Sequence, residues 1–177
     1  MAATGQGRAS ARVNIYGSGE TNVATGVPVL DHLLTLLAHY ASFDLALEVE
    51  PGDAEVEIAA AARALGDALA EHLRARDVRG HGSAVLPVDE ALAQVTLEAS
   101  GRPLLASKVD LSEARIAGLA GDLGARFLEE LAQAAGLTLH VRLVEGSDSQ
   151  HVLEAIFKGL GVALSQAVRS RRKETDG

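Results

Sequence analysis

The feature that most constrains the fold of this chain is a pattern that recurs after a shift of 94 residues, from Phe43 to Leu137. Alternating apolar residues, typical of a strand with one buried face, appear at Phe43, Leu45, Leu47 and Val49, and again at Leu137, Leu139, Val141 and Leu143. A segment with helical spacing of leucines precedes each stretch, at residues 30–37 and 126–135. Because strand and helix recur together, we interpret the chain as a duplicated structural unit.

A second helical segment follows each alternating stretch. Its apolar stripe contains Ile58, Ala61, Ala62 and Leu65 in the first copy, and Leu153, Ile156, Phe157 and Leu160 in the second. Residues 82–110 read as short strands with breaks near residues 87–89 and 100–103. We therefore predict a single α+β domain of two similar halves, about 9–78 and 79–170, each a small mixed sheet with helices on one face. Residues 1–8 and 171–177 are expected to be flexible tails.

Composition argues against several classes of function. The formal net charge is −8 and aromatic residues make up only 3%, so a nucleic acid would find neither a basic surface nor a stacking platform. The chain has no cysteine, which leaves His, Asp and Glu as the ligands for any metal ion. The sequence contains no run of 18 apolar residues, so no membrane-spanning helix is predicted. We expect a cytoplasmic protein with no nucleic-acid or membrane partner.

Four stretches of the chain form an ordered set of motifs. They are TGVPVLDHLL at residues 25–34, GSAVLPVDEALA running on to SGRP at residues 82–103, AGLTLHVR at residues 135–142 and QHVLEAIFK at residues 150–158. In this order and spacing they resemble the imidazoleglycerol-phosphate dehydratase family, lyases of histidine biosynthesis. The resemblance covers about residues 10–170.

The resemblance implies a fold, an assembly and a metal site. It implies two pseudo-repeated ferredoxin-like halves, a homo-oligomer built through trimers into a closed shell, and sites between subunits that hold two manganese ions. A His-His-x-x-Glu motif is implied in each half, where the adjacent imidazoles face two metals and the Glu one turn later returns to the same face. Such a site holds an imidazolate, so the ring accepts electrons while a proton leaves carbon and hydroxide departs.

Only three of the implied metal ligands match, namely His32, His151 and Glu154. Gln150 replaces the first His of the second motif, and its amide is a poor ligand for a divalent metal. Tyr40 stands where the resemblance implies a further His on the first helix. The sequence therefore predicts a degenerate metal site.

The first half has lost its motif entirely. The equivalent positions are Glu55, Val56 and Ala59, and Arg126 occupies the counterpart of His32 in the second half. We predict that Arg126 is a metal replacement, its fixed charge pairing with Glu154 across a subunit boundary. The competing interpretation is an exposed arginine at a helix start.

Two of the residues that the resemblance assigns to substrate binding are retained. Arg102 and Lys158 match positions that contact the phosphate, whereas the arginine expected before Gly82 is replaced by Gly80 and preceded by Arg79. The Ser-Thr-Lys segment of the family's C-terminus is missing. Lys158 also follows Glu154 by one helical turn, so a Glu–Lys pair is an alternative role.

Each retained residue also has a structural interpretation. For His151 and Glu154 we favour a structural hydrogen bond at a helix start over metal ligation, and for Arg102 a role in structure or assembly over phosphate binding. His32 follows Asp31, a residue type that N-caps helices. Its two interpretations, a metal ligand or a hydrogen bond within an interface, are left equally open.

These residues lead to three functional hypotheses. The leading one is a divergent paralogue of the family with an incomplete dimanganese site, little or no dehydratase activity and a structural or regulatory role; no cofactor is expected. The alternative is a working dehydratase whose reduced manganese site is completed by a neighbouring subunit. The third is a module that binds a phosphorylated small molecule through Arg102 and Lys158.

Overall fold

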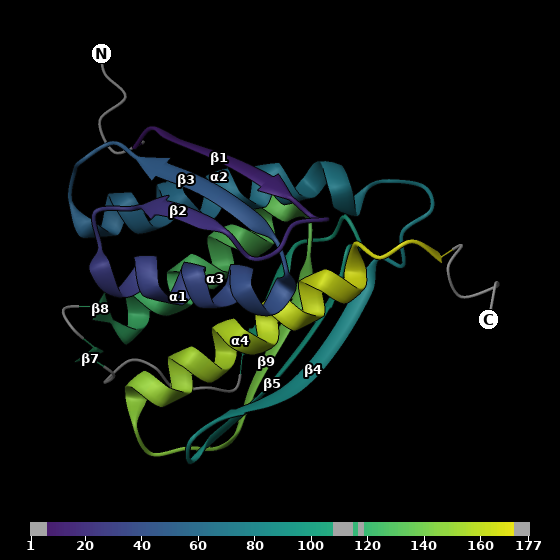
Figure 1. Cartoon of the computed structure of the whole chain (residues 1–177). Coiled ribbons are helices and arrows are strands. Elements are labelled where there is room, and N and C mark those ends of the chain that lie inside the picture. Colours follow the sequence, from purple (N-terminus) through teal and green to yellow (C-terminus); the bar gives the residue numbers. More distant parts are fainter. Residues whose placement is uncertain (1–6, 108–114, 117–118, 172–177) are drawn as a thin grey trace.

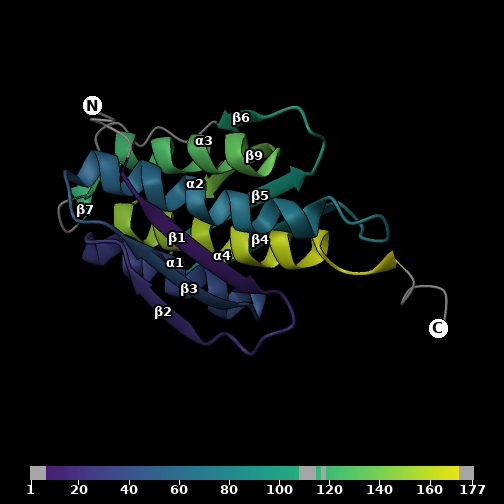
Figure 2. The same ribbon diagram turned by 90° about the horizontal axis from the view of Figure 1, so that it is seen from above.

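Helices of the two halves pack against each other between two mixed sheets, which gives four layers (Figures 1 and 2). The computed structural model describes residues 7–107, 115–116 and 119–171. The expected tails lie largely outside these residues. Among the helices of the described residues, none is long and apolar enough to cross a membrane.

The first half contains three strands and two helices: β1 (Ala9–Asn14), β2 (Thr21–Ala24), α1 (Pro28–Ala41), β3 (Asp44–Val49) and α2 (Ala54–Leu73). The strand order is β1-β3-β2, with β1 antiparallel and β2 parallel to the central strand. Both helices cover one face of this sheet, because the apolar residues of β3 alternate and point to that side.

The second half begins with the hairpin β4 (His81–Val88) and β5 (Ala91–Glu98), followed by β6 (Leu104–Ser107), β7 (Arg115–Ile116), β8 (Leu119–Ala120), α3 (Gly121–Ala135), β9 (Thr138–Glu145) and α4 (Ser149–Ala167). Its main sheet has the order β4-β5-β9-β6, with β5 antiparallel and β6 parallel to β9. Helices α3 and α4 cover the face of this sheet that is turned toward the first half (Figure 1).

The two halves share one topology. The order β1-β3-β2 corresponds to β5-β9-β6 with the same strand directions, and β4 is an additional edge strand. Leu47 lies opposite Ala11, and Val141, its counterpart after the 94-residue shift, lies opposite Val95. The predicted α+β class, with a mixed sheet and helices in each half, is confirmed.

Glycines set the closest approaches between the helices of the two halves. Gly161 of α4 packs on α1 so closely that an added Cβ would lie 2.4 Å from the carbonyl oxygen of Leu37. At the equivalent Gly66 of α2, an added Cβ would lie 2.6 Å from the Cβ of Ala134 in α3. The predicted apolar stripes of α2 and α4 are buried in this central helical layer.

Helix α1 begins earlier than the sequence analysis expected. Its N-cap is Val27 and its first residue is Pro28, whose fixed φ suits a helix start, so the expected N-cap role of Asp31 is wrong. Asp31 lies in the first turn and accepts hydrogen bonds from the backbone N–H of Thr25 at 2.9 Å and from its hydroxyl at 2.5 Å. This carboxylate therefore ties the β2–α1 connection to the helix.

Candidate functional site

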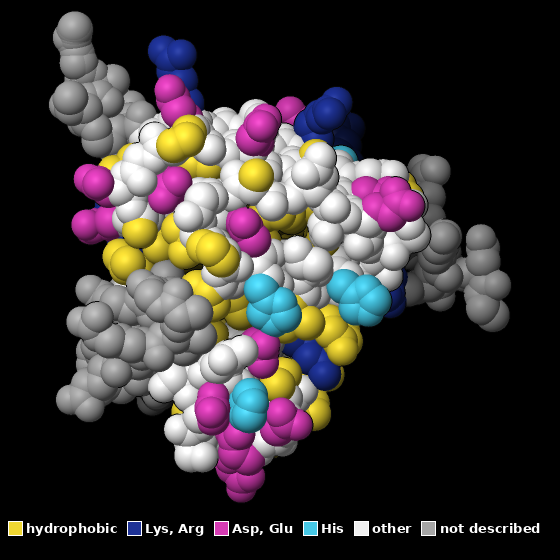
Figure 3. Space-filling view, turned by 60° about the vertical axis from the view of Figure 1, so that its left-hand side comes forward, with side chains coloured by type: hydrophobic (Ala, Val, Ile, Leu, Met, Phe, Trp, Pro, Cys, Tyr) yellow, Lys and Arg dark blue, Asp and Glu magenta, His cyan; other side chains and the backbone are white. Residues whose placement is uncertain are grey.

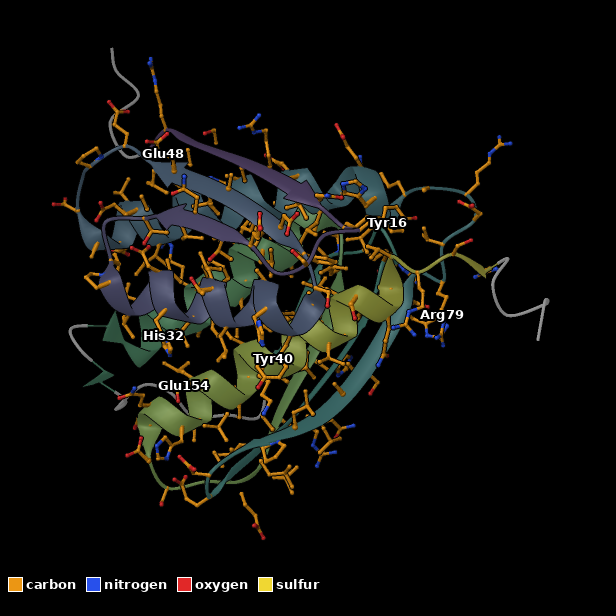
Figure 4. All side chains as sticks on the ribbon, viewed as in Figure 1. Tyr16, His32, Tyr40, Glu48, Arg79 and Glu154 are labelled. Atoms are coloured by element: carbon orange, nitrogen blue, oxygen red, sulfur yellow. The ribbon has the colours of Figure 1, made fainter. Side chains whose placement is uncertain are left out.

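The facing surfaces of α1 and α4 bring together two of the three retained ligand candidates. The Nε2 atom of His32 lies 2.8 Å from the Oε1 atom of Glu154 (Figure 4). The Glu154 side chain is 15% exposed and that of His32 is 55% exposed, so the carboxylate lies beneath the imidazole at the surface. The pair joins the first half of the chain to the second.

His151, the third candidate, is held by other carboxylates. Its Nδ1 atom hydrogen-bonds to Oε1 of Glu90, and its Nε2 atom lies 3.3 Å from Oδ2 of Asp89, at the turn between β4 and β5. The side chain of Asp148 caps α4 by accepting the backbone N–H groups of Gln150 and His151. Figure 3 shows a face on which a histidine side chain is surrounded by acidic side chains.

The contact between His151 and Glu90 shifts the pKa of both side chains. The hydrogen bond that His151 donates to Glu90 raises the pKa of His151, and the nearby carboxylates of Asp148 and Asp89 add to this effect. The same hydrogen bond lowers the pKa of Glu90, helped by the backbone N–H groups of Asp148 and Ser147. Both ring nitrogens of His151 therefore face acidic side chains of their own chain.

Lys158 points away from Glu154 and toward two other partners. Its Nζ atom donates a hydrogen bond to the carbonyl oxygen of Pro87 at 3.0 Å and lies 4.7 Å from the centre of the Tyr40 ring. Figure 4 shows Tyr40 on the side of α1 that faces α4. The i,i+4 pair of Lys158 with Glu154 is absent among the described ion pairs, because the ammonium group is drawn to the aromatic face and the carbonyl.

Arg126 and Glu55 meet on the opposite pair of helices. Nη1 of Arg126 in α3 lies 3.4 Å from Oε1 of Glu55 in α2, and its Nη2 lies 3.8 Å from Oε1 of Glu130. Glu130 also pairs with Arg63 of α2 at 3.5 Å. Within the chain, Arg126 therefore has different carboxylate partners from the expected Glu154.

The remaining candidates do not join either cluster. Arg102 lies in the exposed turn between β5 and β6, where its backbone N–H donates to the Ser100 hydroxyl at 3.1 Å and its carbonyl accepts from Thr138 at 3.1 Å. Arg79 lies close in space to the last described residue, Arg171, whose side chain donates a hydrogen bond to the Arg79 carbonyl. The structure thus separates Arg102 from Lys158 within one chain.

The retained residues of one chain do not fit a dimanganese centre. Among the described residues, no three His, Asp or Glu side chains converge on a point where they could hold a metal ion. His32 and Glu154 come together, but His151 is turned to Glu90 and Asp89. Val56 and Ala59 offer no donor atom in the other half.

Sequence reasoning missed the partners that complete these contacts. Asp89 and Glu90 lie inside one of the four family-like stretches. Their contact with His151 could not be predicted from sequence spacing, because it depends on how the β4–β5 hairpin lies against the start of α4. Glu55 was noted only as a lost ligand. Glu55 and Arg126 have opposite charges, and this was the signal in the sequence that could have predicted their ion pair.

Solved structures share this fold along nearly the whole chain. The imidazoleglycerol-phosphate dehydratase of Staphylococcus aureus superposes with a TM-score of 0.84 at 28% identity, covering 92% of this chain and 94% of that one. The enzyme of Pyrococcus furiosus, in complex with (S)-C348, superposes with a TM-score of 0.81 at 30% identity, covering 92% and 90% of the two chains.

Relatives identified by sequence carry the same name. The imidazoleglycerol-phosphate dehydratase of Syntrophobacter fumaroxidans is 41% identical over 94% of this chain and 86% of its own length, and that of Acetivibrio thermocellus is 36% identical over 94% and 87%. These names favour the working dehydratase over the divergent paralogue. The family model of imidazoleglycerol-phosphate dehydratase matches residues 25–164. The chain therefore belongs to the imidazoleglycerol-phosphate dehydratase family, lyases of histidine biosynthesis.

Proposed function

We propose that this chain is a member of the family that has given up the dimanganese reaction and serves histidine biosynthesis as a structural or regulatory companion. The observation that carries the proposal is the Arg126–Glu55 ion pair, at 3.4 Å, on two positions that the resemblance assigns to metal ligands. A guanidinium carries a permanent charge and offers no lone pair to a metal ion.

The lost ligands support the same proposal. Val56 and Ala59 are apolar, and Ala59 is only 3% exposed, so neither side chain has a donor for a divalent ion. A reaction that relies on two metal ions to hold an imidazolate has no electron sink without them. Neither Val56 nor Ala59 supplies an acid that could take the place of that sink.

The second candidate is a working dehydratase, which the names of the relatives favour. In that case His32 and Glu154, already 2.8 Å apart, would hold manganese together with groups of a neighbouring subunit. The metal would supply a Lewis acid for the imidazole ring of the substrate. Arg102 and Lys158 would then contact the phosphate, which requires Lys158 to leave Tyr40 and Pro87.

Both candidates include a homo-oligomer in the cytoplasm, built as the trimer-based shell that the resemblance implies. Light scattering at several protein concentrations tests the assembly. A mass that stays at one chain over the whole range contradicts it.

Metal analysis and a dehydratase assay separate the two candidates. Protein purified without chelators should carry far less than one manganese ion per chain and should not turn over imidazoleglycerol phosphate when manganese is added. Two tightly held ions per chain with turnover would establish the working dehydratase. Any turnover should then disappear in Glu154→Ala, which controls for a contaminating host enzyme.

A further inference from the structure

Three side-chain pairs link the helices of the first half to those of the second. They are Glu55–Arg126 between α2 and α3, and His32–Glu154 and Tyr40–Lys158 between α1 and α4. The resemblance assigns all of these positions to metal ligands or to phosphate binding. In this chain they contact each other.

The pair between α2 and α3 belongs to a charge-balanced network. Arg126 contacts Glu55 and Glu130, and Glu130 in turn contacts Arg63, so two positive and two negative groups alternate across the two helices. A hollow of about 430 Å³ opens beside Arg126 and Glu130. The network needs no additional cation to neutralise its carboxylates.

Arg126 also opposes a divalent ion at this place. Its charge is permanent, and a cation placed between it and Glu55 would meet like charge at a distance of a few ångströms. Release of a metal ion from a ligand set leaves its carboxylates unbalanced, whereas the guanidinium stays attached to the fold. The positive charge at this contact is therefore part of the chain and cannot be removed by a chelator.

The link between α1 and α4 has the same property. The ammonium of Lys158 is held by the Tyr40 ring and the Pro87 carbonyl, so α1, α4 and β4 meet at one point. A histidine in place of Tyr40 offers a smaller ring and a lone pair. Tyr40 therefore suits a cation that belongs to the chain itself.

We propose that these pairs occupy, within the chain, the positions that the resemblance assigns to metal ligands and phosphate contacts, and link the helices of the two halves there, so that the fold of this chain is independent of divalent cations. This inference rests on the proposed loss of the dimanganese centre.

The first test is the thermal unfolding midpoint of the full chain in EDTA and in manganese chloride. The proposal expects the same midpoint in both solutions. A metal ion held at a hundred times its dissociation constant would raise the midpoint of a chain of this size by about 5 °C or more. A rise of that size, or a fall in EDTA, overturns the proposal.

The second test is a double-mutant cycle on Glu55→Gln and Arg126→Gln. Each substitution should lower the midpoint by about 1–3 °C, as expected for an exposed ion pair in a chain of this size, and the double variant should lose less than the sum. Glu71→Gln and Arg142→Gln form the matched control, because both residues are exposed and neither takes part in a described ion pair. Their effects should add.

Additive losses for Glu55 and Arg126 would show that the pair is not a link and would overturn the proposal. The outcome is separable from the proposed function, because the cycle measures stability alone. The chain could turn over imidazoleglycerol phosphate and still show coupling between Glu55 and Arg126 and the same unfolding midpoint with and without metal. That result would contradict the companion role but leave the proposal about the side-chain pairs intact.

Discussion

The two halves of this chain share a fold but differ at equivalent positions of α2 and α4. In α4, Gln150, His151 and Glu154 begin the helix with polar side chains, whereas in α2 the same three places hold Glu55, Val56 and Ala59. The partner helices differ as well, because α1 carries His32 where α3 carries Arg126. The two halves therefore share a backbone arrangement but differ in the chemistry of these positions.

Helix packing and ligand chemistry are therefore separable in this fold. Both helix pairs retain a glycine at the crossing and a buried apolar stripe. The side chains near the helix starts differ, with imidazole and carboxylate in one pair of helices and guanidinium and carboxylate in the other. Substitutions at the crossings should therefore affect stability much more than substitutions at the surface pairs.

The largest expected effect concerns the glycines of the two crossings. Gly161→Ala should lower the free energy of unfolding by about 2–3 kcal/mol, because its Cβ would meet the backbone carbonyl of Leu37 at 2.4 Å and neither helix can move freely. Gly66→Ala should cost less, about 1–2 kcal/mol, because its Cβ would meet the Cβ of Ala134 at 2.6 Å and the nearest backbone atom only at 3.1 Å; the helix propensity of alanine offsets part of the cost in both variants.

Urea unfolding of the two variants measures the difference. Equal losses would show that the two crossings are equally tight. A larger loss for Gly66→Ala would reverse the comparison between the halves.

The crossings also show how far sequence reasoning reaches. The alternation around Leu45 and Leu139 predicted both central strands, because a strand with one buried face leaves a period of two in its own sequence. The partner of Arg126 could not be predicted in this way, since it depends on how α2 lies against α3. The same holds for Lys158, which a helical spacing rule paired with Glu154 although Tyr40 and Pro87 hold it.

The second prediction asks whether the two halves remain geometrically equivalent. Ala59 corresponds to Glu154 and Arg126 to His32, so the carboxylate of Ala59→Glu should reach Arg126 as Glu154 reaches His32 at 2.8 Å. Ala59→Glu alone should then cost about 1–2 kcal/mol, because Ala59 is only 3% exposed and the longer side chain must displace its neighbours. Ala59→Glu with Arg126→Leu should cost at least about 1 kcal/mol more, because the carboxylate is left partly buried and unpaired.

Chemical denaturation of the single and double variants provides the measurement, with Arg126→Leu alone as the control. If Ala59→Glu costs the same with and without Arg126, the two halves no longer place these positions alike.

A third, smaller effect compares the two surviving pairs. His32→Ala should lower the free energy of unfolding by about 1 kcal/mol, because it removes the partner of the Glu154 side chain, which is only 15% exposed. Arg126→Ala should cost about 0.5 kcal/mol or less, since Glu55 is 63% exposed and remains hydrated. Raising the salt concentration should weaken both contacts, and measured losses in the opposite order would contradict the burial argument.

The smallest effect depends on pH and concerns the first residue of each central strand. Asp44 at the start of β3 holds the β1–β2 connection by accepting N–H groups of Ser18, Gly19 and Glu20 at 2.9, 3.2 and 3.0 Å. At the equivalent place in β9, the hydroxyl of Thr138 holds the β5–β6 connection through Ser100, at 2.6 Å. The same connection is thus secured by a titratable group in one half and a neutral group in the other.

The backbone N–H groups, led by that of Ser18, hold the pKa of Asp44 below its ordinary value of 3.8. A carboxyl with a lowered pKa in the folded state stabilises the protein above its unfolded pKa, and this contribution is lost as the pH falls through the folded value. Asp44→Asn should therefore destabilise the chain at pH 7 and flatten the decline of its unfolding midpoint below about pH 4. Thr138→Val should lower the midpoint by the same amount at both pH values, and an acid-dependent loss in that variant, or an unchanged acid decline in Asp44→Asn, would refute the assignment of acid sensitivity to the first half.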